Sequence, residues 1–259
     1  MGGMYDQSMR HFFELLWGMT EKELRARYKY TVLGFFWLVL NPILQMLVIG
    51  FIFTFFMKEP IGNYYYYLFI GLLIWNFFSL SLTKATPSIV YERSLIKKAR
   101  FPHAVIPLSI ILSSFMHFVL AFGLFLVPVF FLGTFSLTRI PQLLFGIILL
   151  TTFTGGLSLL TTALNVRFRD INFFVQAVLI VWFYATPIIY SLTMIPQHLL
   201  WLWRINPMTS ILQLFQHALL DGIPPGPLML AVNTGIVMVI VVLGIFVFQS
   251  ESKFFDDWV

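Results

Sequence analysis

Three cationic side chains stand directly before the first long apolar run of the sequence, and polar residues lie inside that run. The stretch "RARYKYTVLGFFWLVLNP" begins with Arg25, continues through Arg27 and Lys29, and ends with Asn41 and Pro42. Cations at the level of lipid headgroups attract anionic lipid and can equally receive a pyrophosphate. A proline inside a helix frees a backbone carbonyl and can bend the helix. The stretch is therefore either a stop signal with an ordinary proline kink or the wall of a path for a phosphorylated substrate.

Uncharged polar residues inside the apolar runs are a second candidate for binding chemistry, and Asn76, Gln176 and Asn233 are examples. Such groups either form hydrogen bonds between helices or line a conduit for a polyhydroxylated substrate, where aromatic rings offer flat apolar faces to sugars. The candidate residues for a substrate path or a lipid headgroup site are Arg25, Arg27, Tyr28, Lys29, Trp37, Asn41, Gln45, Trp182 and Tyr184.

The sequence lacks the motifs that catalysis would need. There is no Gly-Lys pair, hence no P-loop to cradle a nucleotide phosphate, and no HExxH or paired-cysteine spacing for a metal. The five histidines are dispersed, which is typical of packing or interfacial residues. All acidic residues lie outside the apolar runs, which disfavours an ion-coupled carrier. We therefore predict no catalytic, metal or cofactor site in this chain.

The composition is that of an integral membrane protein. Of 259 residues, 59% are hydrophobic and 10% are charged, and the mean hydropathy is +0.88. A soluble domain carries roughly 25% charged residues, and a helix needs ~20 apolar residues to cross a bilayer. The predicted fold is all-α, with six transmembrane helices at residues 33–57, 64–83, 104–132, 141–164, 173–192 and 228–248. The first 32 residues lack the apolar core of a signal peptide, so we expect the N-terminus to be retained.

Residues 193–227 separate the last two predicted spans and break the pattern. They are rich in Trp, Pro and Leu, and Pro187 already interrupts the span before them. Trp201 and Trp203 suit the headgroup boundary, whereas the prolines break any continuous crossing. We expect short interfacial or re-entrant helices here rather than a seventh span.

Lys and Arg are unevenly divided among the loops. Thirteen of the 16 lie in the N-terminal segment, the loops after the second and fourth predicted spans, and the C-terminal tail. The positive-inside rule then puts both termini in the cytoplasm. The net charge of +5 is accordingly a topology signal, and no nucleic-acid motif accompanies it.

Two of these basic segments have the pattern of short helices. Residues 8–24 place Phe12, Phe13 and other apolar residues at helical spacing, which predicts an amphipathic helix on the membrane surface. Residues 87–102 lie between prolines and carry apolar residues among charges. The first segment is either a membrane anchor or a docking surface for a partner. The second is either a solvated stop signal or such a docking surface.

Several motifs, taken together, resemble one family of transporters. They are "RYKYTVLGFFWLVLNP", "ERSLIKKARFP", "NVRFRDI", "ATPIIYS" and "INPMT", in this order along the chain. The set is similar to that of the membrane subunits of ATP-binding-cassette exporters for cell-surface polysaccharides, which are the O-antigen, capsule and teichoic acid permeases.

The resemblance implies a homodimer of six-span subunits, each engaging a separate nucleotide-binding subunit that uses ATP and Mg. Such exporters move a polymer attached to undecaprenyl pyrophosphate across the bacterial plasma membrane, so this chain would not itself be an enzyme. The same-superfamily alternative is a permease for a drug or small lipid.

The resemblance also implies an organisation for the chain. Residues 1–32 would form a cytoplasmic segment with the interface helix, and residues 33–259 the transmembrane domain. Within that domain, residues 84–103 would form a coupling loop and residues 193–227 re-entrant helices that close the outer side. The candidate residues for coupling to the ATPase are Phe12, Phe13, Tyr91, Glu92, Arg93, Leu95, Lys97 and Lys98.

Overall fold

The computed structural model describes residues 2–29, 34–56, 61–98 and 101–255, and the regular structure within them is helical. The α-helices are α1 (Gly2–Tyr28), α2 (Trp37–Phe56), α3 (Tyr64–Ala85), α4 (Ser88–Tyr91), α5 (Arg93–Lys98), α6 (Val105–Phe131), α7 (Ile140–Arg167), α8 (Asp170–Tyr184), α9 (Leu200–Ile205), α10 (Pro207–Leu220) and α11 (Pro227–Glu251). Short 3-10 turns are η1 (Gly34–Phe36), η2 (Leu137–Arg139), η3 (Leu192–Met194) and η4 (Ser252–Phe254).

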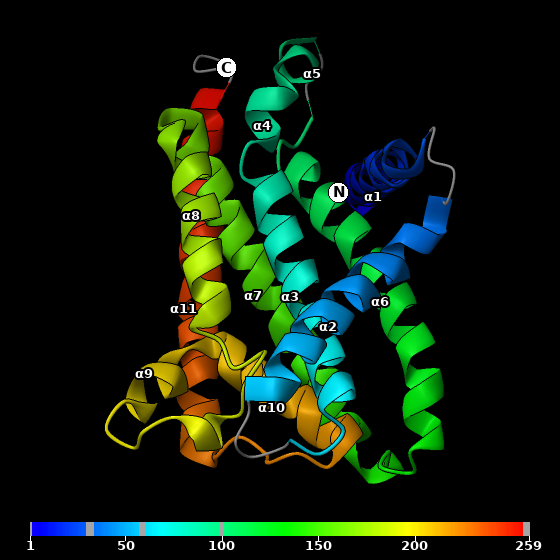
Figure 1. The fold of residues 1–259 in the computed structure, drawn as a ribbon. Coiled ribbons are helices and arrows are strands. Elements are labelled where there is room, and N and C mark those ends of the chain that lie inside the picture. Colours follow the sequence, from blue (N-terminus) through cyan, green and yellow to red (C-terminus); the bar gives the residue numbers. More distant parts are fainter. Residues whose placement is uncertain (1, 30–33, 57–60, 99–100, 256–259) are drawn as a thin grey trace.

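The longer helices form an up-and-down bundle (Figure 1). Helices α2, α3, α6, α7, α8 and α11 run between its two ends, α4 and α5 lie at one end, and α9 and α10 lie at the other. Four helices are long and apolar enough to cross a membrane: Tyr64–Ala85, Val105–Phe131, Leu137–Arg167 and Pro227–Phe254. The all-helical prediction is confirmed, and four of the expected spans meet this criterion within the described ranges.

The first and fifth expected spans do not meet this criterion within the described residues. Their apolar helical parts cover Val39–Phe55 and Asp170–Tyr184. The fifth was expected to reach residue 192, but α8 ends at Tyr184, shortly before Pro187. A proline lacks the backbone N–H that would continue the ladder and pushes the residue before it out of the helical conformation. Thr186 instead directs its hydroxyl to the Trp182 carbonyl, at 2.7 Å, which closes the last turn.

Helix α3 is the centre of the bundle, because its side chains are buried along most of its length. An aromatic layer joins it to its neighbours. The ring of Phe78 on α3 stacks on that of Phe153 on α7, with 5.4 Å between ring centroids. Trp182 on α8 meets Phe78 edge-on at a centroid distance of 5.3 Å. Aromatic pairs in these geometries add to the stabilisation from buried area alone. The layer therefore fixes α3, α7 and α8 as one unit.

Two glycines let α7 and α11 touch through their backbones. A Cβ atom on Gly156 would lie 2.7 Å from the Cα of Val241, and a Cβ on Gly244 would collide with the carbonyl of Gly156. Small residues at such crossings allow the close approach on which helix packing in membranes depends. Only glycine fits at these two positions.

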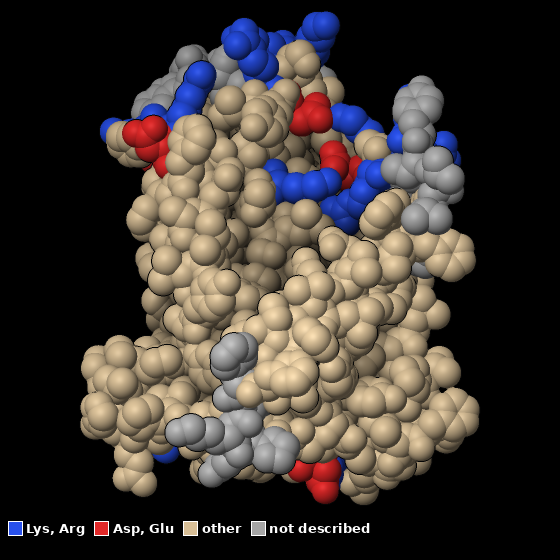
Figure 2. Space-filling view, in the orientation of Figure 1, with Lys and Arg blue, Asp and Glu red and all other residues tan. Residues whose placement is uncertain are grey.

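Basic residues gather at one end of the bundle. Figure 2 shows Lys and Arg concentrated at the end that holds α1, α4 and α5, which we name the basic end. Within the described part of the chain, the basic residues at the opposite end are Arg139 and Arg204. The division of charge expected from the sequence is thus also a division in space.

Candidate functional site

A cavity of about 540 Å³ opens between α1, α2, α3 and α6, in the half of the bundle nearer the basic end. Figure 2 shows this face hollowed, with charged side chains at the rim. We name the cavity the Arg27 pocket. Its polar lining consists of Arg27, Asn41, Asn76, Ser79, Thr83, Ser114 and His117, and its other lining residues are Trp37, Pro42, Leu73, Phe77, Leu80, Phe118 and Ala121.

An arginine and a histidine meet at the mouth of the Arg27 pocket. Arg27 lies in the last turn of α1, where the helix dipole favours a cation. Its Nη1 contacts Nδ1 of His117, which is buried on α6. A guanidinium can only donate, so the imidazole accepts at Nδ1 and is neutral in this arrangement. The pair therefore presents one positive charge to the cavity.

Neutral polar groups continue the lining deeper in the bundle. Asn76 on α3 donates from Nδ2 to Oε1 of Gln45 on α2, at 3.3 Å, so that Gln45 holds the amide that faces the cavity. The Ser114 hydroxyl is buried and has no hydrogen-bond partner among the described residues. A buried polar atom without a partner costs free energy. The Arg27 pocket thus combines one cation with amides and hydroxyls that can bind an anion carrying neutral polar groups.

The structure brings together several of the residues predicted from the sequence. Arg27, Trp37 and Asn41 line the same cavity, and Gln45 is one hydrogen bond away from it. Arg25 instead pairs with Glu21 on the outer surface of α1, at 2.5 Å. Lys29 is exposed just after α1. The Tyr28 side chain lies outside the described residues, as do positions 30–33.

Trp182 and Tyr184 lie elsewhere in the chain, on α8. The indole of Trp182 donates to Oδ1 of Asn206, at 3.0 Å, and so ties α8 to the start of α10. Tyr184 is exposed, and its carbonyl accepts from the hydroxyl of Tyr190 at 2.7 Å. Burial raises the pKa of the Tyr190 phenol, which keeps this donor protonated. Within one copy of the chain, neither predicted residue reaches the Arg27 pocket.

The sequence analysis missed His117 and the hydroxyls near it. His117 was assigned to packing, yet it contacts Arg27 in the cavity. Ser109, Ser113 and His117 recur every four residues on α6, and Ser79 and Thr83 do so on α3. Residues four apart share a helix face, so this stripe of polar residues on two apolar helices was the available signal.

The predicted coupling residues form a surface at the basic end. Lys22 on α1 pairs with Glu92, between α4 and α5, with 2.7 Å between Nζ and Oε1. The Phe12 and Phe13 rings meet edge to face at 5.7 Å. The exposed side chains of this surface are Phe13, Tyr91, Arg93, Lys97 and Lys98, and Leu95 is half-buried. The ion pair joins the two segments that the sequence singled out separately.

These short helices are rooted in the ends of the long ones. Ile89 on α4 and Ile96 on α5 are buried in a small core with Ile106 of α6, Val166 of α7 and Phe248 of α11. Packed cores transmit displacement, because their side chains leave few voids to absorb it. A push on α4 and α5 would therefore reach α6, α7 and α11.

The fold and charge distribution define a helical membrane protein with several crossings. The family model for the ABC-2 type transporter matches residues 14–220, which is most of the chain, and the chain belongs to this family. Within it, the chain is similar to proteins named "O-antigen export system permease protein RfbA". Two from Klebsiella pneumoniae are 34% and 33% identical over 92% of this chain and 93% of their own length. One from Myxococcus xanthus is 36% identical over 81% of this chain and 84% of its own length.

Proposed function

We propose that this chain is the membrane subunit of an ATP-driven exporter that moves a lipid-linked cell-surface polysaccharide across the bacterial plasma membrane. The observation that carries the proposal is the similarity, over nearly the whole of both chains, to permeases named for O-antigen export. We propose O-antigen as the exported polymer, with capsular polysaccharide and teichoic acid as the alternatives.

The topology of the proposal has six spans. The four long helices cross the membrane, and α2 and α8 supply the two shorter crossings. The positive-inside rule assigns the basic end, with both termini, to the cytoplasm. Helices α9 and α10 are then re-entrant elements on the outer side, and residues 1–32 form the cytoplasmic segment.

The Arg27 pocket is the proposed entry site for the undecaprenyl pyrophosphate end of the polymer. A guanidinium binds phosphate through parallel charge-assisted hydrogen bonds. Arg27 supplies that group, and Asn41, Asn76 and Ser114 supply neutral partners for phosphate oxygens or the first sugar. Trp37 at the same cavity offers an apolar face to a sugar ring.

The energy would come from a separate subunit. The sequence has no P-loop, so ATP and Mg would be bound and used by a nucleotide-binding partner. That partner would dock on the surface formed by α1, α4 and α5, with Phe13 and Tyr91 as exposed aromatic anchors. Two copies of this chain would form the translocation path, with one partner subunit on each.

The proposal is tested by isolating the tagged chain from its native membranes in mild detergent and analysing bound proteins and lipids by mass spectrometry. The expected result is an equimolar P-loop ATPase and an undecaprenyl-linked saccharide. A chain that lacks an ATPase and acts in liposomes under an ion gradient would overturn the proposal in favour of a carrier. An ATPase complex that moves a drug or small lipid, while surface polysaccharide persists without it, would assign a different cargo.

A further inference from the structure

A second and larger cavity, of about 890 Å³, lies at the end opposite the basic end. It is enclosed by α9, α10, the segment that joins α10 to α11, and the start of α11. We name it the Gln216 pocket. Its size falls within the ~300–1,000 Å³ that is usual for small-molecule sites. The side chains that matter for binding are Tyr67, Trp201, Arg204, Gln213 and Gln216.

Two amides in this cavity each have one buried atom without a hydrogen-bond partner in the part of the chain that the structure describes. Gln216 is only 6% exposed, and its Nε2 has no partner among the described residues. It lies near enough to Tyr67 to act on that phenol as a hydrogen-bonding side chain, but no contact of normal hydrogen-bond length joins the two groups. The Tyr67 hydroxyl bonds instead to the carbonyls of Pro187 and Tyr190 at 2.9 Å each. The Oε1 of Gln213, one turn earlier on α10, is buried and also without a partner. Because buried polar groups are nearly always bonded, a donor and an acceptor left open on one face indicate a missing partner.

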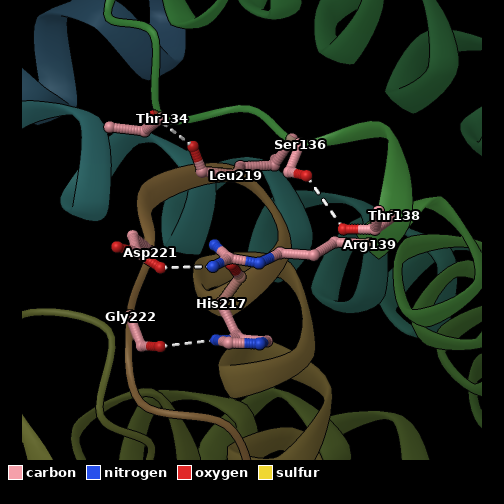
Figure 3. Close-up of polar contacts among 8 residues, drawn as sticks. All are labelled: Thr134, Ser136, Thr138, Arg139, His217, Leu219, Asp221 and Gly222. Carbon is pink, nitrogen blue, oxygen red and sulfur yellow. Dashed lines mark hydrogen bonds and ion pairs between the residues drawn. The ribbon is translucent and has the colours of Figure 1, made fainter.

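The segment that closes this cavity is held by the contacts drawn in Figure 3, and the side chains of Gln213 and Gln216 take no part in them. Arg139 pairs with Asp221 at 2.6 Å and donates to the carbonyl of His217 at 3.1 Å. His217 Nδ1 lies 2.7 Å from the Gly222 carbonyl, and Thr134 donates to the Leu219 carbonyl at 2.6 Å. These contacts clamp the end of α10 from the loop between α6 and α7. The amides are therefore preorganised without being satisfied by the clamp.

The chemistry of the lining fits an uncharged polyol. The acidic group at the cavity, Asp221, is engaged by Arg139, so it does not make the site anionic. Trp201 is 58% exposed and offers an indole face, while Arg204 adds an exposed guanidinium that can donate to hydroxyls. Amides that donate and accept beside an aromatic ring are what a sugar requires, because its hydroxyls do both and its C–H face is apolar.

We propose that the Gln216 pocket binds a saccharide unit, with the Gln213 and Gln216 amides bonding its hydroxyls and Trp201 packing on its ring. The inference rests on the proposed polysaccharide export and adds a binding site for the cargo at the outer end. There the pocket would hold the glycan as it leaves the exporter, at the opposite end of the bundle from the Arg27 pocket that takes its phosphorylated end.

The test uses the intact exporter complex in lipid nanodiscs. The probe is lipid-free polysaccharide released by mild acid from the surface of the cells that make this protein, titrated by calorimetry. The parent is expected to bind it saturably, and the double variant Gln213→Leu/Gln216→Leu to bind at least tenfold more weakly. The matched control is Gln197→Leu, at an exposed glutamine of the same end that does not line the cavity, and it should bind as the parent does.

Thermal stability separates binding from a structural role. Because the two amide atoms have no partners, the double variant should melt at the parent's temperature or above it. Trp201→Ala, at an exposed ring, should also weaken binding tenfold without lowering the melting temperature. Absence of saturable binding by the parent, or equal affinity of the parent and both variants, would overturn the inference. A double variant that melts lower, combined with normal binding by Trp201→Ala, would assign the amides to packing and overturn it as well.

Surface polysaccharide in cells tells the two proposals apart. If deletion of the gene leaves surface polysaccharide intact, the proposed export function fails. If export depends on the gene while the pocket variants bind and export as the parent does, only the saccharide site fails.

Discussion

The Arg27 pocket and the Gln216 pocket lie toward opposite ends of one bundle and differ in how their polar groups are arranged. In the first, a cation contacts a neutral histidine, and Gln45 and Asn76 bond to each other. In the second, the amides of Gln213 and Gln216 stay open while the surrounding backbone is clamped. The first suits a charged group and the second a neutral polyol.

The contrast corresponds to the two parts of the proposed cargo, which are an anionic lipid-linked end and a long polymer of hydroxylated sugar units. The Arg27 pocket, which has a fixed positive charge, would bind the end, and its affinity would fall with added salt because the interaction is electrostatic. In the Gln216 pocket, amides and an indole make the proposed sugar contacts beside the exposed cation Arg204, and affinity for the sugar units would depend less on salt. The predictions below change one pocket while leaving the other as an internal control.

The largest effect is expected from removing the charge of the Arg27 pocket. Arg27→Gln should lower export at least tenfold, since loss of a phosphate-binding guanidinium costs about 1.5–3 kcal/mol. Polysaccharide binding at the Gln216 pocket should be unchanged. Export of labelled polymer into inside-out vesicles measures the first quantity, and calorimetry with lipid-free polysaccharide measures the second.

Arg25→Gln is the matched control for that experiment. It removes an arginine from the same turn of α1, but one whose ion pair with Glu21 is exposed. Exposed pairs contribute about 0–1 kcal/mol, so export should stay within about twofold of the parent. If both changes lowered export equally, the segment would act through its total positive charge. The proposed entry site could then no longer be assigned to the Arg27 pocket.

A smaller effect is expected from loosening the clamp on the Gln216 pocket. Arg139→Gln removes the pairing with Asp221 and the bond to the His217 carbonyl. Asp221 is largely exposed, so the combined loss should be about 1–2 kcal/mol of stability, seen as a slightly lower melting temperature. Saccharide affinity should fall while the response to Arg27→Gln stays the same. Unchanged affinity would mean that the amides do not depend on the clamp for their placement.

The ion pair between Lys22 and Glu92 should affect activity more than stability. Its side chains are partly exposed, at 55% and 28%, which makes a large contribution to folding free energy implausible. Reversal of either charge should lower polymer-stimulated ATPase activity about threefold, and the exchanged pair Lys22→Glu/Glu92→Lys should restore most of it. Both pockets should bind normally throughout. Failure of the exchange to rescue activity would remove the pair from the coupling surface.

The smallest effect is expected from the hydrogen bond between Gln45 and Asn76. Bonds between membrane helices average about 0.6 kcal/mol, so Gln45→Leu should shift the melting temperature by only a degree or two. Because the variant removes the hydrogen bond that orients the Asn76 amide, transport of polymer should fall about twofold. If Gln45→Leu has no effect on transport while Asn76→Leu does, Asn76 acts on its own in the cavity.

The sequence predicted the parts of the fold that depend on local pattern. The apolar runs gave the membrane class and the four long helices, and the helical spacing of Phe12 and Phe13 gave a helix that the structure contains within α1. Residues 87–102, between prolines, were expected to hold one short helix, and the structure has two there, α4 and α5. These features are decided by residues a few positions apart, which a single sequence displays.

The sequence could not display contacts made between distant segments. Arg27 and His117 meet although many residues separate them, because α1 packs against α6. The open amides of Gln213 and Gln216 are defined by partners that are missing in space, which no spacing along the chain reveals. The bond from the Trp182 indole to Asn206 likewise joins two helices, and no pattern along the chain displays it.

The glycine contact between α7 and α11 also provides a reference for measuring motion. The backbones of α7 and α11 touch at Gly156 and Gly244, and the Val241 side chain packs beside Gly156, so a shift of one helix along the other would press backbone against backbone. The distance between spin labels placed on α7 and α11 should therefore stay constant through the ATP cycle. With the distance from α7 to α11 as a constant reference, a changing distance from α7 to α2 would show that the α2 wall of the Arg27 pocket moves, and by how much.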